Sequence, residues 1–211
     1  SLVAGPNGFC DQGAKVIVLC NEEGYGRVVM RYINAVSGYD KHELQVPELR
    51  KKAMAAFLRI KPNLMFKDAT SCDMNWVESV CKSYKPDIVI LDMGDKFANK
   101  TGADSHVYLK DAAIHARNIA KQYDCAVIWM SQLSAEAEGK IYVDQSMLEG
   151  SKTGKAAECD LMVLISKNPQ VEGEYESDTQ RHLNVAKNKL KGGWHGVVHC
   201  QLDGERARYS A

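Results

Sequence analysis

The sequence predicts an α/β protein in which a mostly parallel sheet is flanked by helices, with a C-terminal antiparallel hairpin. Strand and helix candidates alternate along most of the chain, and the run Asp87–Asp92 is apolar between its two carboxylates. A continuous apolar run is typical of a strand buried on both faces, as in parallel sheets covered by helices. With 211 residues, 45% of them hydrophobic and 26% charged, we expect one globular domain over residues 1–211.

Each element follows from its pattern of apolar residues. Helical patterns cover Arg27–Ser37, Val46–Arg59, Met74–Ser83 and Tyr108–Tyr123. Apolar runs predict five strands that we place in the mostly parallel sheet with right-handed crossovers, at Lys15–Cys20, Leu64–Lys67, Asp87–Asp92, Cys125–Met130 and Leu161–Ile165. Two further strands, Leu183–Lys187 and Gly196–Leu202, flank the turn residues Lys189–Gly193 and predict the antiparallel hairpin.

Composition excludes some classes of protein and leaves others open. Lys plus Arg and Asp plus Glu number 27 each, so net charge neither indicates nor excludes a nucleic-acid partner. No stretch approaches the roughly 18 apolar residues of a membrane span, and the N-terminus lacks a signal-peptide pattern. The seven cysteines never form a Cys-x-x-Cys pair, which favours reduced thiols over a metal site or a disulfide framework. We therefore expect a cytoplasmic protein without a membrane partner.

Four polar groups fall at the ends of successive predicted elements. Asn21–Glu23 follows the first strand, Asp92 ends the apolar run, and Ser131–Gln132 follows the strand at Cys125–Met130. Lys187–Lys189 lies at the start of the hairpin turn. Because the carboxyl ends of parallel strands share one rim of a sheet, we expect the first three groups to converge.

Each group has a role in hydrolysing a phosphoanhydride. Asp92 has the form of a Walker B aspartate, which places the Mg²⁺ of a nucleotide, and Glu22 or Glu23 can orient or deprotonate the attacking water. A Gln132 amide can contact a γ-phosphate and report its loss, and a cation from a neighbouring subunit can stabilise the transition state. Each residue alone is more often a solvated turn residue or a polar strand ending. Their order and spacing together support the hypothesis.

With these residues in place, the sequence resembles the RecA-like motor domain of DnaB-type replicative helicases, including the phage members, over nearly all of its length. Glu22 matches the catalytic glutamate of the family, Asp92 the Walker B aspartate, and Gln132, within Met130–Leu133, the polar switch residue. Leu148–Ser151 followed by Cys159–Leu164 resembles the stretch that precedes the next core strand.

The resemblance also implies cofactors and partners. Lys187 and Lys189 match the basic positions that reach into the neighbouring subunit's ATP site; many family members have Arg at the second. The ammonium of Lys189 can supply the charge but not the bidentate fork of Arg. ATP and Mg²⁺ are the implied cofactors. Single-stranded DNA, further copies in a hexameric ring, and primase are the implied partners, in a bacterial or phage-infected cell. In the loop Ala135–Lys155 we expect Lys152 and Lys155 to contact DNA phosphates.

A P-loop of the form G-x-x-x-x-G-K-[ST] is not found in the sequence. Gly8–Lys15 has an inserted Ala and leads into a strand, and Gly150–Ala156 is one residue short and ends in Ala. By family spacing, the Walker A lysine is expected a few residues before Ser1, with Ser1–Gly5 as the end of the P-loop helix. We expect these 211 residues alone to bind ATP poorly.

Two alternatives remain. A RecA-type recombinase core that forms filaments is favoured by Lys187–Asn188–Lys189, whereas Ser131–Gln132–Leu133 favours the helicase. The second is a non-catalytic module without a P-loop that binds a partner, which gains weight only if the natural protein begins near Ser1.

Overall fold

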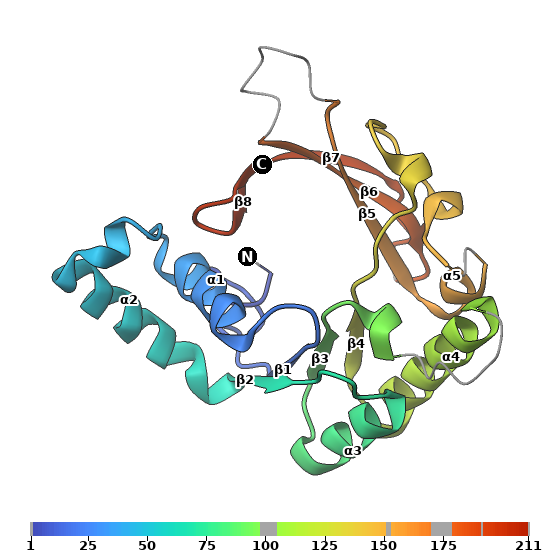
Figure 1. The fold of residues 1–211 in the computed structure, drawn as a ribbon, viewed down its shortest axis with the longest axis horizontal. Coiled ribbons are helices and arrows are strands. Elements are labelled where there is room, and N and C mark those ends of the chain that lie inside the picture. The colour runs from blue at the N-terminus through green and yellow to red at the C-terminus, as the bar shows by residue number, and fades with distance from the viewer. Residues whose placement is uncertain (1, 98–104, 151–152, 170–178, 191, 211) are drawn as a thin grey trace. The chain divides into compact units, whose positions relative to one another are not determined.

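The computed structural model describes residues 2–97, 105–150, 153–169, 179–190 and 192–210 (Figure 1). The chain divides into two compact units. The first unit contains residues 1–97, 118–130 and 203–208, and the second contains residues 98–117, 131–202 and 209–211. Both are built from segments that lie far apart in the sequence.

The first unit is built on a parallel sheet with the strand order β2-β1-β3-β4. Its strands are β1 (Val16–Cys20), β2 (Leu64–Asp68), β3 (Ile88–Leu91) and β4 (Ala126–Trp129). Every residue of β1 and β3 is buried, as their uninterrupted apolar sequences predict. The mostly parallel sheet predicted from the sequence is confirmed.

Helices cover both faces of this sheet. The helices α1 (Tyr25–Ser37) and α2 (Pro47–Ile60) pack on one face, where Val28, Ile33, Phe57 and Ile60 meet Val16, Val18 and Ile90. The helix α3 (Met74–Tyr84) covers the opposite face (Figure 1). The helix α4 (Ser105–Tyr123) contributes its last residues to the first unit. Among the helices that the structure describes, none is both long enough and apolar enough to cross a membrane.

Local signals fix where these helices begin and end. Asp73 caps α3 by accepting a hydrogen bond from the backbone N–H of Trp76, and Pro47 occupies the first turn of α2, where its missing N–H costs nothing. The helix α1 ends at Gly38, which adopts the left-handed conformation (φ 76°) and donates to the carbonyl of Asn34. Short 3-10 turns complete the chain, namely η1 (Glu43–Gln45), η2 (Lys61–Asn63), η3 (Gly94–Phe97), η4 (Ala135–Ala137) and η5 (Gln145–Met147).

The second unit contains α5 (Gly154–Glu158) and a separate sheet with the order β5-β6-β7-β8. The strands β6 (Gln180–Asn188) and β7 (Gly196–Asp203) form the predicted antiparallel hairpin. The short strand β8 (Arg208–Ser210) has no counterpart among the predicted strands.

One strand was assigned to the wrong sheet. The strand β5 (Leu161–Lys167), expected in the parallel sheet, pairs antiparallel with β6. Its burial alternates, since Leu164 and Ser166 are buried whereas Val163 and Ile165 are exposed. An apolar run alone does not distinguish such a half-buried strand from one buried on both faces.

The first described residues also differ from expectation. Residues 2–4 form turns rather than the end of a helix. The carbonyls of Leu2 and Val3 accept hydrogen bonds from the N–H groups of Phe9 and Cys10, which lie seven positions further along the chain. That bonding closes a loop and is incompatible with the i to i+4 pattern of a helix.

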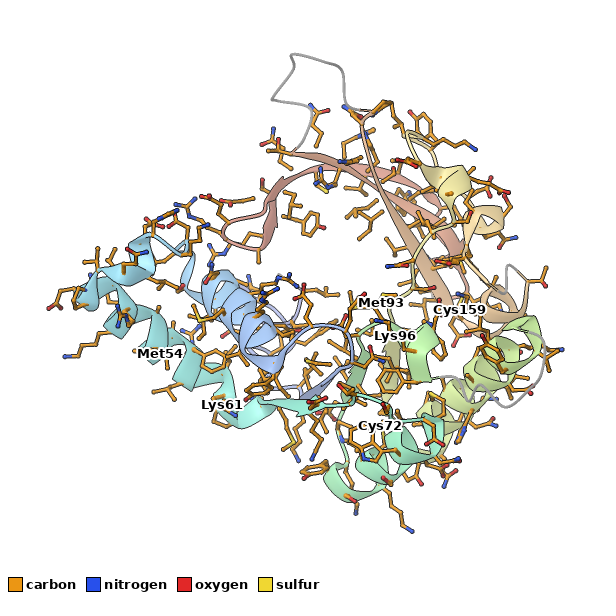
Figure 2. All side chains as sticks on the ribbon, in the orientation of Figure 1. Met54, Lys61, Cys72, Met93, Lys96 and Cys159 are labelled. Atoms are coloured by element: carbon orange, nitrogen blue, oxygen red, sulfur yellow. The ribbon has the colours of Figure 1, made fainter. Side chains whose placement is uncertain are left out.

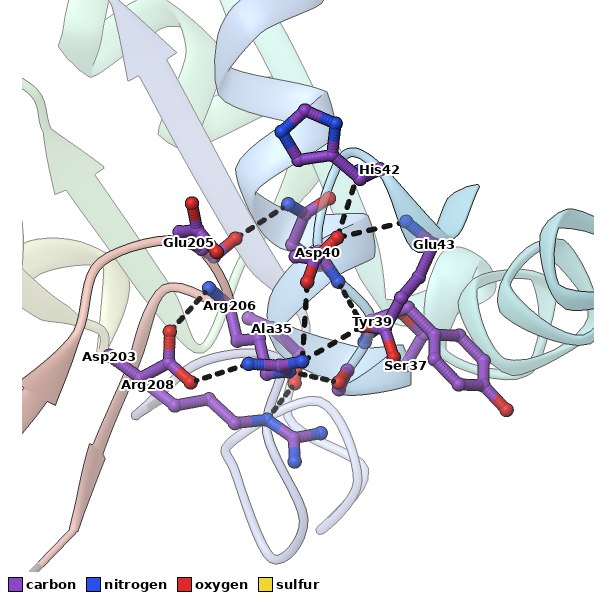
Figure 3. A network of polar contacts seen from close by, with 12 residues as sticks. Ala35, Ser37, Tyr39, Asp40, His42, Glu43, Asp203, Glu205, Arg206 and Arg208 are labelled. Carbon is purple, nitrogen blue, oxygen red and sulfur yellow. Dashed lines mark hydrogen bonds and ion pairs between the residues drawn. The ribbon is translucent and has the colours of Figure 1, made fainter. Parts of the chain in front are cut away.

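The turn between β7 and β8 caps the C-terminal end of α1 (Figure 3). Arg206 donates from Nε to the carbonyl of Gly38 at 2.9 Å, and Arg208 donates from Nε to the carbonyl of Ala35 at 2.8 Å. The last carbonyls of a helix lack partners within the helix and carry partial negative charge. Since α1 has no basic residue in its own last turn, these distant arginines supply the missing cations.

The same Arg206 guanidinium pairs with three carboxylates. It lies 3.2 Å from Asp40, 3.0 Å from Glu43 and 3.2 Å from Asp203. The pKa of Asp40 lies below its ordinary value, chiefly because the backbone N–H of Glu43 donates to the carboxylate, with Arg206 contributing. The pKa of Asp203 is lowered by the backbone N–H and the side chain of Arg206.

We expect Arg206→Met to lower the thermal unfolding midpoint, because the carboxylates and the carbonyl of Gly38 lose their donor. The stability from carboxylates with lowered pKa is present above their unfolded pKa of about 4 and is lost as the pH falls through their folded pKa. The difference from wild type, measured by circular dichroism, should thus be largest near neutral pH and shrink below about pH 4. Arg59→Met, which removes an exposed pair with Asp11, is the control and should change little. An equal loss in both variants would contradict the capping role.

Candidate active site

The parallel pairing of β1 with β3 brings two predicted carboxylates to one edge of the first unit's sheet. Leu19 pairs with Leu91, and the backbone N–H of Asp92 donates to the carbonyl of Leu19 at 3.1 Å. Asp92 therefore begins the loop after β3 beside the point where β1 ends, and Glu22 lies just past that end. This is the edge at which open α/β sheets bind ligands.

A third carboxylate and two cations share this edge. Glu23 accepts an ion pair from Arg31 of α1 at 2.7 Å, and Glu22 pairs with Lys96 of η3 at 3.3 Å. The pKa of Asp92 is raised, first because burial disfavours its charged form and then because Glu22 and Glu23 repel it. Arg31 and Lys96 oppose that rise. The edge thus concentrates negative charge that two resident cations offset in part.

The backbone around Asp92 is held in an unusual conformation. Met93 adopts a left-handed conformation with φ 54°, which is uncommon for residues other than glycine. Its carbonyl accepts a hydrogen bond from the Asn21 amide at 3.3 Å. Figure 2 shows Met93 and Lys96 just beyond the end of β3. Strained backbone of this kind persists where surrounding contacts hold it in place, and it clusters at functional sites.

The donor atoms here fit a hydrated divalent cation. Among the described residues, the buried atoms Asn21 Oδ1 and Glu23 Oε2 have no hydrogen-bond partner, so metal-bound waters could donate to them. No group of three or more His, Cys, Asp or Glu side chains in the described parts of the chain forms a metal cage. Mg²⁺ needs no such cage, because it keeps several waters and binds through one or two carboxylates together with substrate phosphates. A cation shared with a phosphate ligand therefore fits the edge.

The turn η3 ties the end of β3 to the end of β4. The N–H of Gly94 donates to the carbonyl of Met130 at 2.7 Å, and the Trp129 indole donates to Asp95 at 2.9 Å. Phe97 is fully buried. A Cβ at Gly94 would come within 2.5 Å of the Trp129 ring, so only glycine allows the indole to lie against this turn.

The other predicted residues belong to the second unit. Gln132 is exposed, and its carbonyl accepts the N–H of Glu149 at 3.2 Å, next to the bridge between Leu133 and Leu148. Its role at a γ-phosphate stays a prediction. The hydrogen bond ties the segment after β4 to the stretch that was predicted to precede the next core strand.

The two lysines near the hairpin turn are used differently. The Lys187 ammonium donates to the carbonyls of Ala156 and Ala157 at the end of α5, and burial lowers its pKa. Lys189 is exposed, with its backbone N–H bonded to the carbonyl of Asp160. Of this pair, the side chain of Lys189 is the one presented to solvent.

The two predicted DNA contacts fare differently from their expectation. Lys155 is only 8% exposed, and its ammonium donates to the Ser131 hydroxyl at 2.8 Å, so it does not present itself to a phosphate in this structure. It lies in α5, whose neighbouring Ala156 belongs to a small apolar cluster with Leu164. DNA contact by Lys155 would require its side chain to rearrange. Lys152 lies outside the described residues.

Comparison with known proteins identifies the fold. Neither a protein-family model nor a curated protein matches the sequence. Among solved structures, an isolated ATPase domain superposes with a TM-score of 0.83 at 19% identity, over 95% of this chain and 75% of that one. A DnaB-like replicative helicase, solved in a study of its interactions with primase, matches with a TM-score of 0.82 at 19% identity. The chain has the fold of a helicase ATPase domain. The second match covers 95% of this chain and 51% of the helicase chain.

Sequence reasoning missed the two cations of this helicase-like site. Lys96 follows the apolar run by several residues, and Arg31 sits within an amphipathic helix, so neither stands out in the sequence. Glu23 enters the sequence prediction only as an alternative to Glu22. A basic residue shortly after a strand-ending carboxylate is the one signal that could have pointed to Lys96.

We expect Gly94→Ala to displace the Trp129 indole from Asp95 and to destabilise the protein by about 1–3 kcal/mol, as overpacking does. Thermal unfolding measures the loss, and the Trp129 indole N–H resonance should shift. Gly26→Ala is the matched control, because a Cβ there meets nothing within 4 Å and alanine favours the helix α1. If both variants were equally stable, the close packing of Gly94 on Trp129 would be refuted.

Proposed function

We propose that this chain is the motor domain of an ATP-dependent replicative DNA helicase. The observation that carries the proposal is the pair Glu22 and Asp92 at the ends of adjacent parallel strands, in a fold shared with helicase ATPase domains. Low sequence identity limits the comparison to the fold, so the activity rests on these residues and on their match to the family motifs.

The proposed chemistry assigns one task to each side chain. Asp92 would hold Mg²⁺ through a water, and Glu22 would orient and deprotonate the water that attacks the γ-phosphate. Bound Mg²⁺ neutralises charge that develops on the phosphates. Gln132 would contact the γ-phosphate and transmit its loss to the segment bonded to Glu149, which carries hydrolysis into movement.

The site would be completed by a neighbouring copy of the chain. Lys189 would enter the adjacent subunit's ATP site, whereas Lys187 supports it by capping α5 in its own chain. The proposed assembly is a hexameric ring on single-stranded DNA, in the cytoplasm of a bacterial or phage-infected cell, with primase as a further partner. Lys152 and Lys155 remain the proposed phosphate contacts.

The first test is ATP hydrolysis by the complete gene product that contains these residues, with and without single-stranded DNA. We expect DNA to stimulate turnover, and Glu22→Gln to lower kcat by about 10²–10⁴-fold, because the neutral amide cannot accept the proton. Glu48→Gln, an exposed change in the first turn of α2, should leave turnover intact. A protein that binds no nucleotide, or that keeps its rate as Glu22→Gln, would favour the partner-binding module instead.

Mixing two inactive variants tests the shared site. Subunits carrying Lys189→Ala and subunits carrying Glu22→Gln should each turn over slowly. Mixed assemblies should regain part of the activity, because some interfaces then combine an intact Glu22 with an intact Lys189. No recovery in assemblies shown to be mixed would mean that Lys189 acts within its own subunit or not at all. Electron microscopy of the same samples on single-stranded DNA separates rings from the filaments of a RecA-type recombinase.

A further inference from the structure

The ion pair between Lys96 and Glu22 occupies the side chain that the proposed function assigns to the attacking water. The Lys96 ammonium lies 3.3 Å from Glu22 Oε1. A carboxylate that neutralises an ammonium is a weaker base and has one oxygen less for water. We propose that Lys96 restrains Glu22 in the nucleotide-free protein and releases it when the nucleotide and its divalent cation bind. This inference rests on the proposed function.

The position of Lys96 is fixed by the residues on either side of it. Asp95 accepts the Trp129 indole hydrogen bond, and Phe97 is fully buried. The backbone N–H of Lys96 itself donates to the carbonyl of Met93 at 3.0 Å. Only the Lys96 side chain is therefore free to swing, and its reach from η3 determines which carboxylate it meets. That carboxylate is Glu22.

The pair is weak enough to work as a reversible restraint. The Lys96 and Glu22 side chains are 44% and 41% exposed, and ion pairs with such exposure change an equilibrium by at most about fivefold. A divalent cation beside Asp92 would repel the ammonium and attract Glu22, so its arrival favours release. By comparison, the Arg31–Glu23 pair is closer, at 2.7 Å, and involves a carboxylate oxygen other than the buried, unpaired Oε2.

Linkage gives a test that does not depend on turnover. If the pair must break when the ligand binds, its removal raises ligand affinity by the factor that breaking it costs. We expect the complete gene product with Lys96→Met to bind a non-hydrolysable Mg²⁺–ATP analogue up to about fivefold more tightly by calorimetry. Lys96→Arg, which keeps the pair, should bind like the wild type. Its DNA-independent hydrolysis should also stay low, whereas that of Lys96→Met should rise.

Two controls separate the restraint from a general effect of charge. Lys82→Met removes an exposed lysine of α3 and should leave analogue affinity unchanged. In a Glu22→Gln background, Lys96→Met should give no further gain, because the pair is already broken. The same gain in both backgrounds would show that Lys96 acts only through its charge, and this would overturn the inference.

The remaining outcomes distinguish this inference from the proposed function. If Glu22→Gln abolishes turnover while Lys96→Met changes neither affinity nor DNA-independent hydrolysis, the motor assignment stands and the restraint is refuted. A fall in hydrolysis for Lys96→Met would show that Lys96 holds Glu22 in its productive position, which also refutes it. A wild-type protein that binds no analogue at all would overturn both.

Discussion

The in-register parallel pairing of β1 with β3 is the constraint on which the candidate site depends. Both strands are buried along their whole length, so their register cannot shift without unpacking helices from both faces of the sheet. The hydrogen bond from the Asp92 N–H to the Leu19 carbonyl is the last step of that pairing. It places the loop that carries Glu22 beside Asp92, although the two residues are distant in sequence. The site is thus a consequence of core packing.

Collecting carboxylates at one edge has an electrostatic cost that the fold offsets only in part. Burial and the neighbouring Glu22 and Glu23 raise the pKa of Asp92, while Arg31 and Lys96 oppose the rise. The unpaired acceptors Asn21 Oδ1 and Glu23 Oε2 add to the same imbalance. A ligand that brings positive charge and hydrogen-bond donors would relieve both. An edge left in this state is better suited to binding than to stability alone, in keeping with the strained backbone at Met93.

The sequence was sufficient to predict the parallel sheet, the helices and the hairpin, because each depends on a local apolar pattern. Its failures came from contacts between distant segments. The run Leu161–Ile165 does not reveal that only one of its faces is buried, and this places β5 in the second sheet. Nothing near Lys155 in the sequence indicates that its ammonium bonds to Ser131. Arg206 likewise caps a helix more than 160 positions earlier in the chain.

The basic residues of this chain therefore divide according to what their charge already does. Arg206 and Lys187 cap the carbonyls of α1 and α5, and mutating either would change folding as well as any role in binding. Lys189 has an exposed side chain and Lys96 holds only an exposed carboxylate, so both can change partners at little cost. A motor needs cations that move between partners as ligands come and go. Sequence position alone would rank Lys187 and Lys189 equally, whereas their partners favour Lys189 for the interface between subunits.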